Sequence, residues 1–243
     1  MRELAESLNI RSARSLTETG ADPITESTET ASVSILKVGG SVLTLPDLVD
    51  RLQHVIRHFA IAAPVLIIGG GSAADTIRRL QPICGLSSEV AHWLAIDSMT
   101  QNAQWLARLH RQIVCVPDRD SAQAAIVSGL LPALHCTAFL RHEELPLEDS
   151  SAAAPQIMTE CRLPCSWSVT SDSIAAWIAA RWPAARLWML KSCDAGASDL
   201  KTLAKEGRVD RFFPHVAAEL SELHWINLRS APDVDQWPCD FRT

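Results

Sequence analysis

Several features that mark common classes of protein are missing from this sequence. No apolar run reaches the ~18 residues that a transmembrane helix needs, so we expect no membrane partner. Residues 1–15 alternate charged and small side chains and lack the apolar core of a signal peptide, which favours a cytoplasmic protein. Acidic residues outnumber basic ones by 28 to 22, which gives a net charge of −6. This balance argues against a nucleic-acid partner, and any anion-binding site must be local.

Paired cysteines are missing as well. The seven cysteines are scattered, odd in number and include no C-x-x-C pair. This distribution predicts buried thiols in a reducing compartment rather than a disulfide framework or a zinc site. His54 and His58 have the four-residue spacing of metal ligands, but no acidic residue lies between them as in H-E-x-x-H. We interpret them as an exposed pair and assign no metal ligand.

Three widespread site motifs do not occur either. The sequence has no G-x-x-x-x-G-K-S/T phosphate loop, no G-x-S-x-G nucleophile elbow and no G-x-G-x-x-G dinucleotide fingerprint. The site must therefore be sought in less standard patterns.

What is present is an alternation of short apolar runs with amphipathic stretches. The apolar runs predict strands at 32–38, 65–68, 112–116, 133–139, 186–191 and 224–228. The stretches between them predict helices at 46–60, 73–80, 87–108, 121–128, 174–181, 198–205 and 213–223, with a break at 82–85. Such alternation predicts an α/β fold with a mostly parallel sheet.

The two least regular regions flank or interrupt this pattern. Residues 1–31 have too few large apolar side chains to offset the entropy of ordering, so we predict a disordered tail and a domain over 32–243. Residues 141–164 predict a loop or a hairpin insertion. The helix at 87–108 is apolar on several sides, and we expect it to be well buried.

Two of the predicted strands end in glycine turns. The first leads from Lys37 into Gly39-Gly40-Ser41, and the second leads into Gly69-Gly70-Gly71 before a helix. Glycine leaves backbone N–H groups bare, so both turns can approach an anion at the carboxyl edge of a parallel sheet. Arg78, in the helix that follows, could fork onto a phosphate or carboxylate, or could belong to a solvated helix face.

Three charged residues stand where they could carry chemistry. Lys37, at the inner end of a buried strand, must reach water or meet an anion, because burying an unpaired ammonium costs several kcal/mol. Lys191, at the end of another strand, repeats this pattern. Asp172 lies in a Thr-Ser-Asp-Ser helix start, where an N-cap is its default role. Two lysines and a carboxylate would suit phosphoryl transfer, which depends mostly on positioning and charge neutralisation.

Taken together, three segments resemble the amino acid kinase superfamily, which contains acetylglutamate, aspartate and uridylate kinases. They are residues 37–41, 68–71 and 169–177, in the order and spacing of that superfamily over roughly residues 32–200. Other stretches are most similar to the kinase of methanofuran biosynthesis and its bacterial relatives, namely residues 91–101, 166–172 and 209–214.

The resemblance implies a three-layer αβα sandwich with two functional halves. The acceptor of the phosphoryl group would bind to residues 32–140, and ATP with Mg²⁺ to residues 165–243. Lys37 would contact the transferring phosphoryl group, and Asp172 would hold the lysines in place. The acceptor side would further use N–H groups and side chains of Gly39, Gly40, Ser41, Gly69, Gly70, Gly71 and Arg78. Lys191, Asp194 and Gly196 match the strand-end segment that lines the nucleotide site.

The activity implied by this resemblance is ATP-dependent phosphoryl transfer to a small molecule that carries a phosphate or carboxylate. In the methanofuran subfamily the acceptor is an aminomethylfuran methyl phosphate of one-carbon cofactor biosynthesis. Residues 191–196 lack the Asp-x-Asp-Gly run usual in the family, so an inactive member that binds an anion or nucleotide is one alternative. A uridylate or acetylglutamate-type kinase is another. Superfamily members are commonly dimers or hexamers, so we also expect a homo-oligomer.

Overall fold

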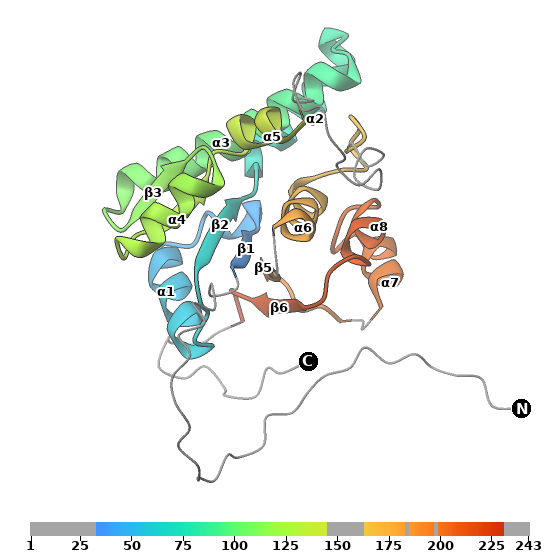
Figure 1. The fold of residues 1–243 in the computed structure, drawn as a ribbon. Helices are drawn as coiled ribbons and strands as arrows, with labels where there is room; N and C mark the ends of the chain where they lie inside the picture. The colour runs from blue at the N-terminus through green and yellow to red at the C-terminus, as the bar shows by residue number, and fades with distance from the viewer. Residues whose placement is uncertain (1–32, 145–162, 183–184, 197–198, 231–243) are drawn as a thin grey trace, which may run out of the picture.

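The computed structural model describes residues 33–144, 163–182, 185–196 and 199–230 (Figure 1). The tail predicted for residues 1–31 and most of the insertion predicted for 141–164 lie outside the described residues.

A six-stranded sheet forms the middle layer, in the order β3-β4-β2-β1-β5-β6 with every pairing parallel. Its strands are β1 Ser34–Val38, β2 Pro64–Ile68, β3 Ile113–Val116, β4 Leu131–Leu134, β5 Arg186–Lys191 and β6 Leu223–Asn227. Strands β2 to β4 lie on one side of β1, whereas β5 and β6 lie on the other. The topology therefore switches direction between β1 and β5, and ligands of open parallel sheets bind outside the carboxyl ends of the strands at such a point.

Helices cover both faces of this sheet (Figure 1). They are α1 Leu48–His58, α2 Gly71–Cys84, α3 Ser88–Leu109, α4 Arg119–Val127, α5 Cys136–Glu144, α6 Ser171–Arg181, α7 Leu200–Lys205 and α8 Phe213–Ala217, with a 3₁₀ turn η1 at Gly40–Val42. The predicted α/β fold with a parallel sheet is confirmed. In the part of the chain that the structure describes, no helix combines the length and apolarity needed to cross a bilayer.

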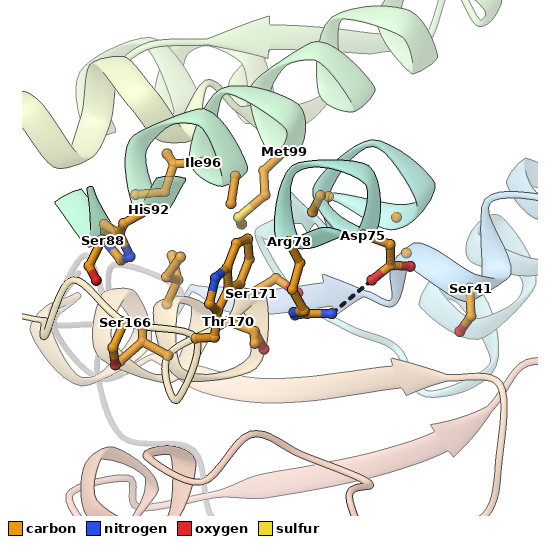
Figure 2. A pocket seen from close by; sticks show the side chains of 18 residues that line it. Ser41, Asp75, Arg78, Ser88, His92, Ile96, Met99, Ser166, Thr170 and Ser171 are labelled. Carbon is orange, nitrogen blue, oxygen red and sulfur yellow. Dashed lines mark hydrogen bonds and ion pairs between the residues drawn. The ribbon is translucent and has the colours of Figure 1, made fainter. Parts of the chain in front are cut away.

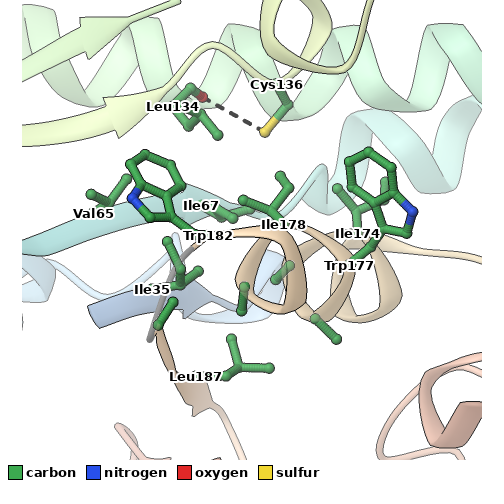
Figure 3. Packing of buried hydrophobic residues seen from close by; sticks show 14 of the residues in the cluster. Ile35, Val65, Ile67, Leu134, Cys136, Ile174, Trp177, Ile178, Trp182 and Leu187 are labelled. Carbon is green, nitrogen blue, oxygen red and sulfur yellow. Dashed lines mark hydrogen bonds between the residues drawn. The ribbon is translucent and has the colours of Figure 1, made fainter. Parts of the chain in front are cut away.

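The two sheet faces follow from the alternation of side chains along each strand. Ile35 on β1 and Ile67 on β2 belong to the core on the α6 face, as Figure 3 shows beside Ile178 of α6. Leu36, the neighbour of Ile35, belongs to the opposite core together with Leu52 of α1. This period of two also decides where the strand-end lysines point.

Helix α6 is buried along most of its length. Its residues from Asp172 to Ala179 are all buried, and most of them are apolar. A helix that is apolar all round is stable only when protein surrounds it, so α6 is held on several sides. Each fully buried isoleucine stabilises this packing by about 1.5–3 kcal/mol relative to an exposed one.

Two predicted boundaries in the N-terminal half are wrong. Helix α2 continues through Pro82 and ends only at Cys84, where Gly85 adopts a left-handed conformation (φ 65°) as the C-cap. Pro82 has no N–H to donate to the Arg78 carbonyl, so α2 lacks one hydrogen bond in its last turn and continues for only two more residues. The strand predicted at 133–139 ends at Leu134 and gives way to α5, since a short apolar run fits strand and helix equally well.

Helices α8 and α3 also differ from what the sequence predicted. The helix predicted at 213–223 ends at Ala217, because Leu223 pairs with Leu187 as the first residue of β6. Helix α3 was expected to be well buried, yet it exposes a stripe of apolar side chains at Val90, Leu94, Trp105 and Leu109.

The thiols are only partly buried. Of the cysteines in the described residues, Cys136 is buried, while Cys84 and Cys165 are exposed. The expectation of buried thiols is therefore wrong for Cys84 and Cys165. Burial raises the pKa of the Cys136 thiol to about 12, so this group stays protonated.

Candidate functional site

Lys37 and Lys191 converge from two neighbouring strands. Lys37 shares the α6 face with Ile35, two residues earlier on β1. Lys191 shares the same face with Met189 on β5, and β5 pairs directly with β1. Both ammonium groups therefore come to the carboxyl ends of the strands beside the first turn of α6, where the topology of the sheet switches.

Asp172 lies between the two lysines. The Lys191 Nζ donates to Asp172 Oδ1 at 3.0 Å and to Oδ2 at 2.8 Å, and Lys37 Nζ forms an ion pair with Oδ1. All three side chains are largely buried, with 3% of Lys37, 7% of Asp172 and 13% of Lys191 exposed. The default role predicted for Asp172 is wrong: the N-cap of α6 is Thr170, whose hydroxyl accepts from the Asp172 N–H.

The electrostatics of this cluster follow from burial and proximity. Burial lowers the pKa of Lys37 from 10.5 to about 8, an effect that Asp172 opposes and the charge of Lys191 reinforces. Burial alone would raise the pKa of Asp172, but the two ammonium groups outweigh it and hold that pKa below its ordinary value. The cluster thus keeps an ionised carboxylate at neutral pH and one lysine that titrates unusually early.

The two glycine turns touch each other through their backbones. A Cβ on Gly40 would lie 2.5 Å from the Gly71 Cα, and one on Gly69 would lie 2.6 Å from the Gly40 nitrogen. Only glycine permits this approach. The Gly39 N–H donates to Leu190 O and the Gly69 N–H to Val38 O, each at 2.8 Å. The N–H that we expected Gly39 to offer a ligand is therefore already used inside the fold.

A cavity of about 220 Å³ opens between these turns, α2, α3 and the loop before α6 (Figure 2). Gly40, Gly70 and Gly71, which belong to the residues predicted for the acceptor side, line it. Polar side chains and apolar side chains share the rest of the wall, including Ser41, Asp75, Arg78, Ser88, His92, Ile96, Met99, Trp167, Thr170 and Ser171. Because His92 is desolvated by burial, its pKa is lowered and its ring is neutral at pH 7.

Two predicted acceptor residues reach this cavity but already have partners. The Arg78 guanidinium donates to Asp75 Oδ1 at 2.9 Å, and its Cζ lies 4.5 Å from the centre of the Trp167 ring. Figure 2 shows the Asp75 contact at the edge of the cavity. The Ser41 hydroxyl donates to Ser192 Oγ at 2.8 Å, which ties the first glycine turn to the end of β5. An anionic ligand would have to compete with Asp75 for Arg78.

A second, larger cavity of about 1100 Å³ is lined by Asp172 and Lys191 of the cluster. Its wall contains five side chains that are cationic at neutral pH, namely Lys191, Lys201, Lys205, Arg208 and Arg211. Its two carboxylates, Asp172 and Asp210, are both engaged in hydrogen bonds. Trp167 and Thr170 line both cavities, so the two cavities meet at the loop before α6, two residues from Asp172, whereas Lys37 lines neither.

Two predicted nucleotide-side residues line neither cavity. The Asp194 carboxylate accepts from Asn227 Nδ2 at 3.1 Å, and its carbonyl accepts from the Arg208 guanidinium. Gly196 has a φ of 73°, and a Cβ there would lie 2.9 Å from Arg208 Nη2. The structure brings Asp194 and Gly196 to Arg208, on the wall of the second cavity, rather than to the cavity itself.

Sequence reasoning gave no role to Asp210 or to Asn102. The Asp210 carboxylate accepts from the loop before α6, from α6 itself and from the start of α8. Its place three residues before Phe213, with proline next, is a typical helix-start pattern and was the available signal. Asn102 Nδ2 donates to Gly69 O at 2.8 Å, which joins α3 to the second glycine turn, and no sequence pattern marks it.

Comparisons with known proteins give a likeness in structure alone. No protein-family model matches the chain, and no curated protein matches it. The uridylate kinase from Archaeoglobus fulgidus superimposes with a TM-score of 0.49 and 15% identity, over 79% of this chain and 88% of that one. The UMP kinase from Ureaplasma parvum gives 0.44 and 13%, over 77% and 84%. At these identities neither likeness assigns a substrate to this chain.

Proposed function

We propose that the protein is a small-molecule kinase that transfers the terminal phosphoryl group of ATP to an acceptor bearing a phosphate or carboxylate. The observation that carries this proposal is the Lys37–Asp172–Lys191 cluster beside the junction of two cavities. Phosphoryl transfer requires little covalent work by the protein, and fixed positive charges at the transferring group supply most of the catalysis.

Each member of the cluster has a distinct role in this proposal. Lys37, on the strand that leads into the first glycine turn, neutralises the charge that develops on the transferring phosphoryl oxygens. Lys191, on the wall of the second cavity, contacts the donor phosphates. Asp172 touches both lysines and fixes the distance between their ammonium groups, so the charges are in place before the substrates arrive.

The second cavity suits a nucleoside triphosphate. Its cationic side chains fit a polyphosphate chain, and its volume exceeds that of the first cavity several times. Among the described residues, no group of three or more His, Cys, Asp and Glu side chains could hold a metal ion. Mg²⁺ would therefore be held mostly by phosphate oxygens and water, as is usual for this ion, and would offset phosphate charge.

The first cavity suits a small anionic acceptor. Gly40, Gly70 and Gly71 line it, and Arg78 contributes a guanidinium to its wall. The finest form of the proposal, drawn from the sequence resemblance, is an aminomethylfuran methyl phosphate as acceptor, which would give a diphosphate in one-carbon cofactor biosynthesis. The alternative acceptors are uridylate and an N-acylglutamate.

The test is calorimetric titration with Mg·ATP followed by turnover assays on an acceptor panel. The native protein should bind Mg·ATP in the micromolar range, at about −8 kcal/mol. Lys37→Ala should still bind the nucleotide yet lose turnover, whereas Arg57→Ala, on the exposed side of α1, should retain both. Turnover that persists in Lys37→Ala would contradict the role given to this lysine.

The main alternative is a protein of the same fold that binds an anion or nucleotide without catalysis. The Asp194 carboxylate is bound by Asn227 and lines neither cavity, which favours this alternative over a standard nucleotide half. Binding of Mg·ATP without turnover on any acceptor would support it. Absence of nucleotide binding would contradict the kinase and direct the search to anions held at the glycine turns.

Self-association stays a prediction. The exposed stripe on α3 follows helical spacing, because Val90 and Leu94, and likewise Trp105 and Leu109, are four residues apart. A second copy of the chain could cover this apolar surface. Analytical ultracentrifugation of the native protein and of Trp105→Lys checks the prediction, since a monomer in both cases would contradict it.

A further inference from the structure

Asp210 carries an unusual number of hydrogen bonds for a single carboxylate. Its Oδ2 accepts from Thr170 N at 2.8 Å, Thr170 Oγ1 at 2.8 Å and Ser173 N at 3.0 Å. Its Oδ1 accepts from Ser173 Oγ at 2.5 Å, Phe212 N at 3.1 Å and Phe213 N at 2.9 Å. Six donors thus converge on one side chain, and none of the ion pairs among the described residues involves it.

These donors surround Asp172 on both sides along the chain. Thr170 is the N-cap of α6, and Ser173 follows Asp172 directly in the first turn. Hydrogen bonds to Thr170 and Ser173 restrain the backbone on both sides of Asp172 and so hold its carboxylate towards Lys37 and Lys191. The partial positive charge of the α6 N-terminus also favours a carboxylate at Asp210 and at Asp172.

The charge of Asp210 acts on the cluster as well. The charged groups that face Lys37 are Asp172 from α6, Lys191 from β5 and Asp210 from the turn before α8. Two ammonium groups and two carboxylates make this arrangement neutral, whereas removal of Asp210 would leave a net positive charge in a buried place. Such an excess makes it harder to keep Lys37 protonated.

We propose that Asp210 is a positioning residue, whose carboxylate locks the first turn of α6 so that Asp172 meets both Lys37 and Lys191. It acts through α6 and need not touch a substrate. The catalytic consequence rests on the function proposed above, but the state of Lys37 can be measured without any turnover.

The experiment compares Asp210→Asn with Asp118→Asn in the full chain. Asp118 is a matched control, because its carboxylate caps α4 by accepting from Ser121 N at 2.7 Å, far from the cluster in the fold. The chain contains only four lysines, so NMR of the ¹³Cε–¹⁵Nζ groups resolves them and Lys37→Ala assigns the signal of Lys37. Circular dichroism verifies that each variant is folded.

In Asp210→Asn we expect the pKa of Lys37 to fall below that of the native protein, since a nearby negative charge is lost. We expect kcat to fall at least about ten-fold while the KM for ATP stays within about three-fold, as for an interaction made in the transition state. Asp118→Asn should change neither quantity. An unchanged Lys37 pKa in a folded Asp210→Asn protein overturns the proposal.

A second variant covers the case in which Asp210→Asn does not fold. Ser173→Ala removes one donor and keeps the carboxylate, so a smaller fall of kcat is expected with native-like folding. Native kcat and native Lys37 pKa in Ser173→Ala would overturn the proposal in that case. If the native protein transfers no phosphoryl group to any acceptor, the proposed function fails, but the Lys37 pKa still decides the role of Asp210.

Discussion

The two cavities that meet beside the lysine–aspartate cluster differ in size, charge and wall. The first measures about 220 Å³, is bounded by glycine backbones in close contact, and contains one arginine that an aspartate already pairs. The second measures about 1100 Å³ and has five basic side chains, of which Lys191 is paired with Asp172 and Arg208 with Glu206. A tight wall selects by shape, whereas an open basic wall attracts by charge.

The difference teaches how a net acidic chain can bind anions. The overall charge of −6 repels polyanions at a distance, so attraction has to be concentrated. The fold achieves this by gathering β5, α7 and the turn before α8 around one cavity. The buried cluster beside the cavities then depends on short-range pairing, which salt screens far less than surface charge.

The largest effect should come from breaking the buried pairing. Asp172→Ala leaves two ammonium groups without a carboxylate, and removal of one partner of a buried ion pair typically costs about 3–5 kcal/mol. Asp75→Ala, which breaks the exposed pair with Arg78 at the mouth of the first cavity, should cost less than about 1 kcal/mol. Urea unfolding of both variants measures the contrast, and equal losses would show that the cluster is not desolvated.

The next effect should come from the wall of the first cavity. In Gly40→Ala the new methyl group meets the Gly71 backbone at 2.5 Å, and such overpacking costs about 1–3 kcal/mol. Gly129→Ala is the matched control: its φ of 72° is strained for alanine, but nothing lies within 4 Å of the added atom. We expect Gly40→Ala to have the lower melting temperature and to lose acceptor binding. A native melting temperature in Gly40→Ala would mean that the two turns can separate freely.

A third effect should appear as the pH rises. With a Lys37 pKa of about 8, kcat should fall up to ten-fold per pH unit above that value, which corresponds to about 1.4 kcal/mol per unit. An arginine stays charged, so Lys37→Arg should lose this pH dependence even if its kcat is lower. A native kcat that is constant from pH 7 to pH 10 would show that the charge of Lys37 is not needed.

This loss of activity should not reflect unfolding. The folded pKa of Lys37 is below its unfolded value of 10.5, so the unfolded state binds more protons between about pH 8 and pH 10.5. The contribution of this group to stability therefore increases as the pH rises through that window. Circular dichroism over the same range checks that the fold persists where activity is lost.

The smallest effect should come from single charges on the second wall. Lys201→Gln and Lys205→Gln each remove an exposed ammonium group, and we expect each to weaken Mg·ATP binding by about 0.5–1 kcal/mol at low salt. The difference from the native protein should shrink as salt is added. Arg78→Gln, in the first cavity, should leave the affinity for Mg·ATP unchanged. Calorimetry at two salt concentrations measures these affinities. If Arg78→Gln bound Mg·ATP as weakly as the lysine variants do, the assignment of the nucleotide to the second cavity would be contradicted.

Local sequence patterns were sufficient to predict the central strands of the sheet. Strands β1 and β5 are apolar, β-branched or aromatic runs that end in polar turns, and both were predicted to within two residues. The glycine turns and the two strand-end lysines were recognisable because each depends on one short stretch. Where a run was short and apolar without other signals, as at Phe139, strand and helix could not be distinguished.

The hydrogen-bond and ion-pair partners of individual side chains could not be predicted from local sequence patterns. Asp172 at a helix start looks the same in sequence whether it caps the helix or pairs with lysines from two strands. Asp210 lies 37 residues from Ser173, and its six donors are assembled only when α6 and α8 pack together. The expected N–H group of Gly39 was lost to Leu190, a residue that parallel pairing alone brings near.

By itself, the sequence determined the alternation of strands and helices, the parallel sheet, and the placing of Lys37 and Lys191 at strand ends, since these depend on side-chain periods of 2 and 3.6 within short stretches. Only the tertiary structure decided that both lysines meet Asp172, that Asp210 holds the turn around it, and that two unlike cavities meet beside this cluster. The physical reason is that burial and charge pairing depend on residues far apart in the chain, which packing alone brings within hydrogen-bonding distance.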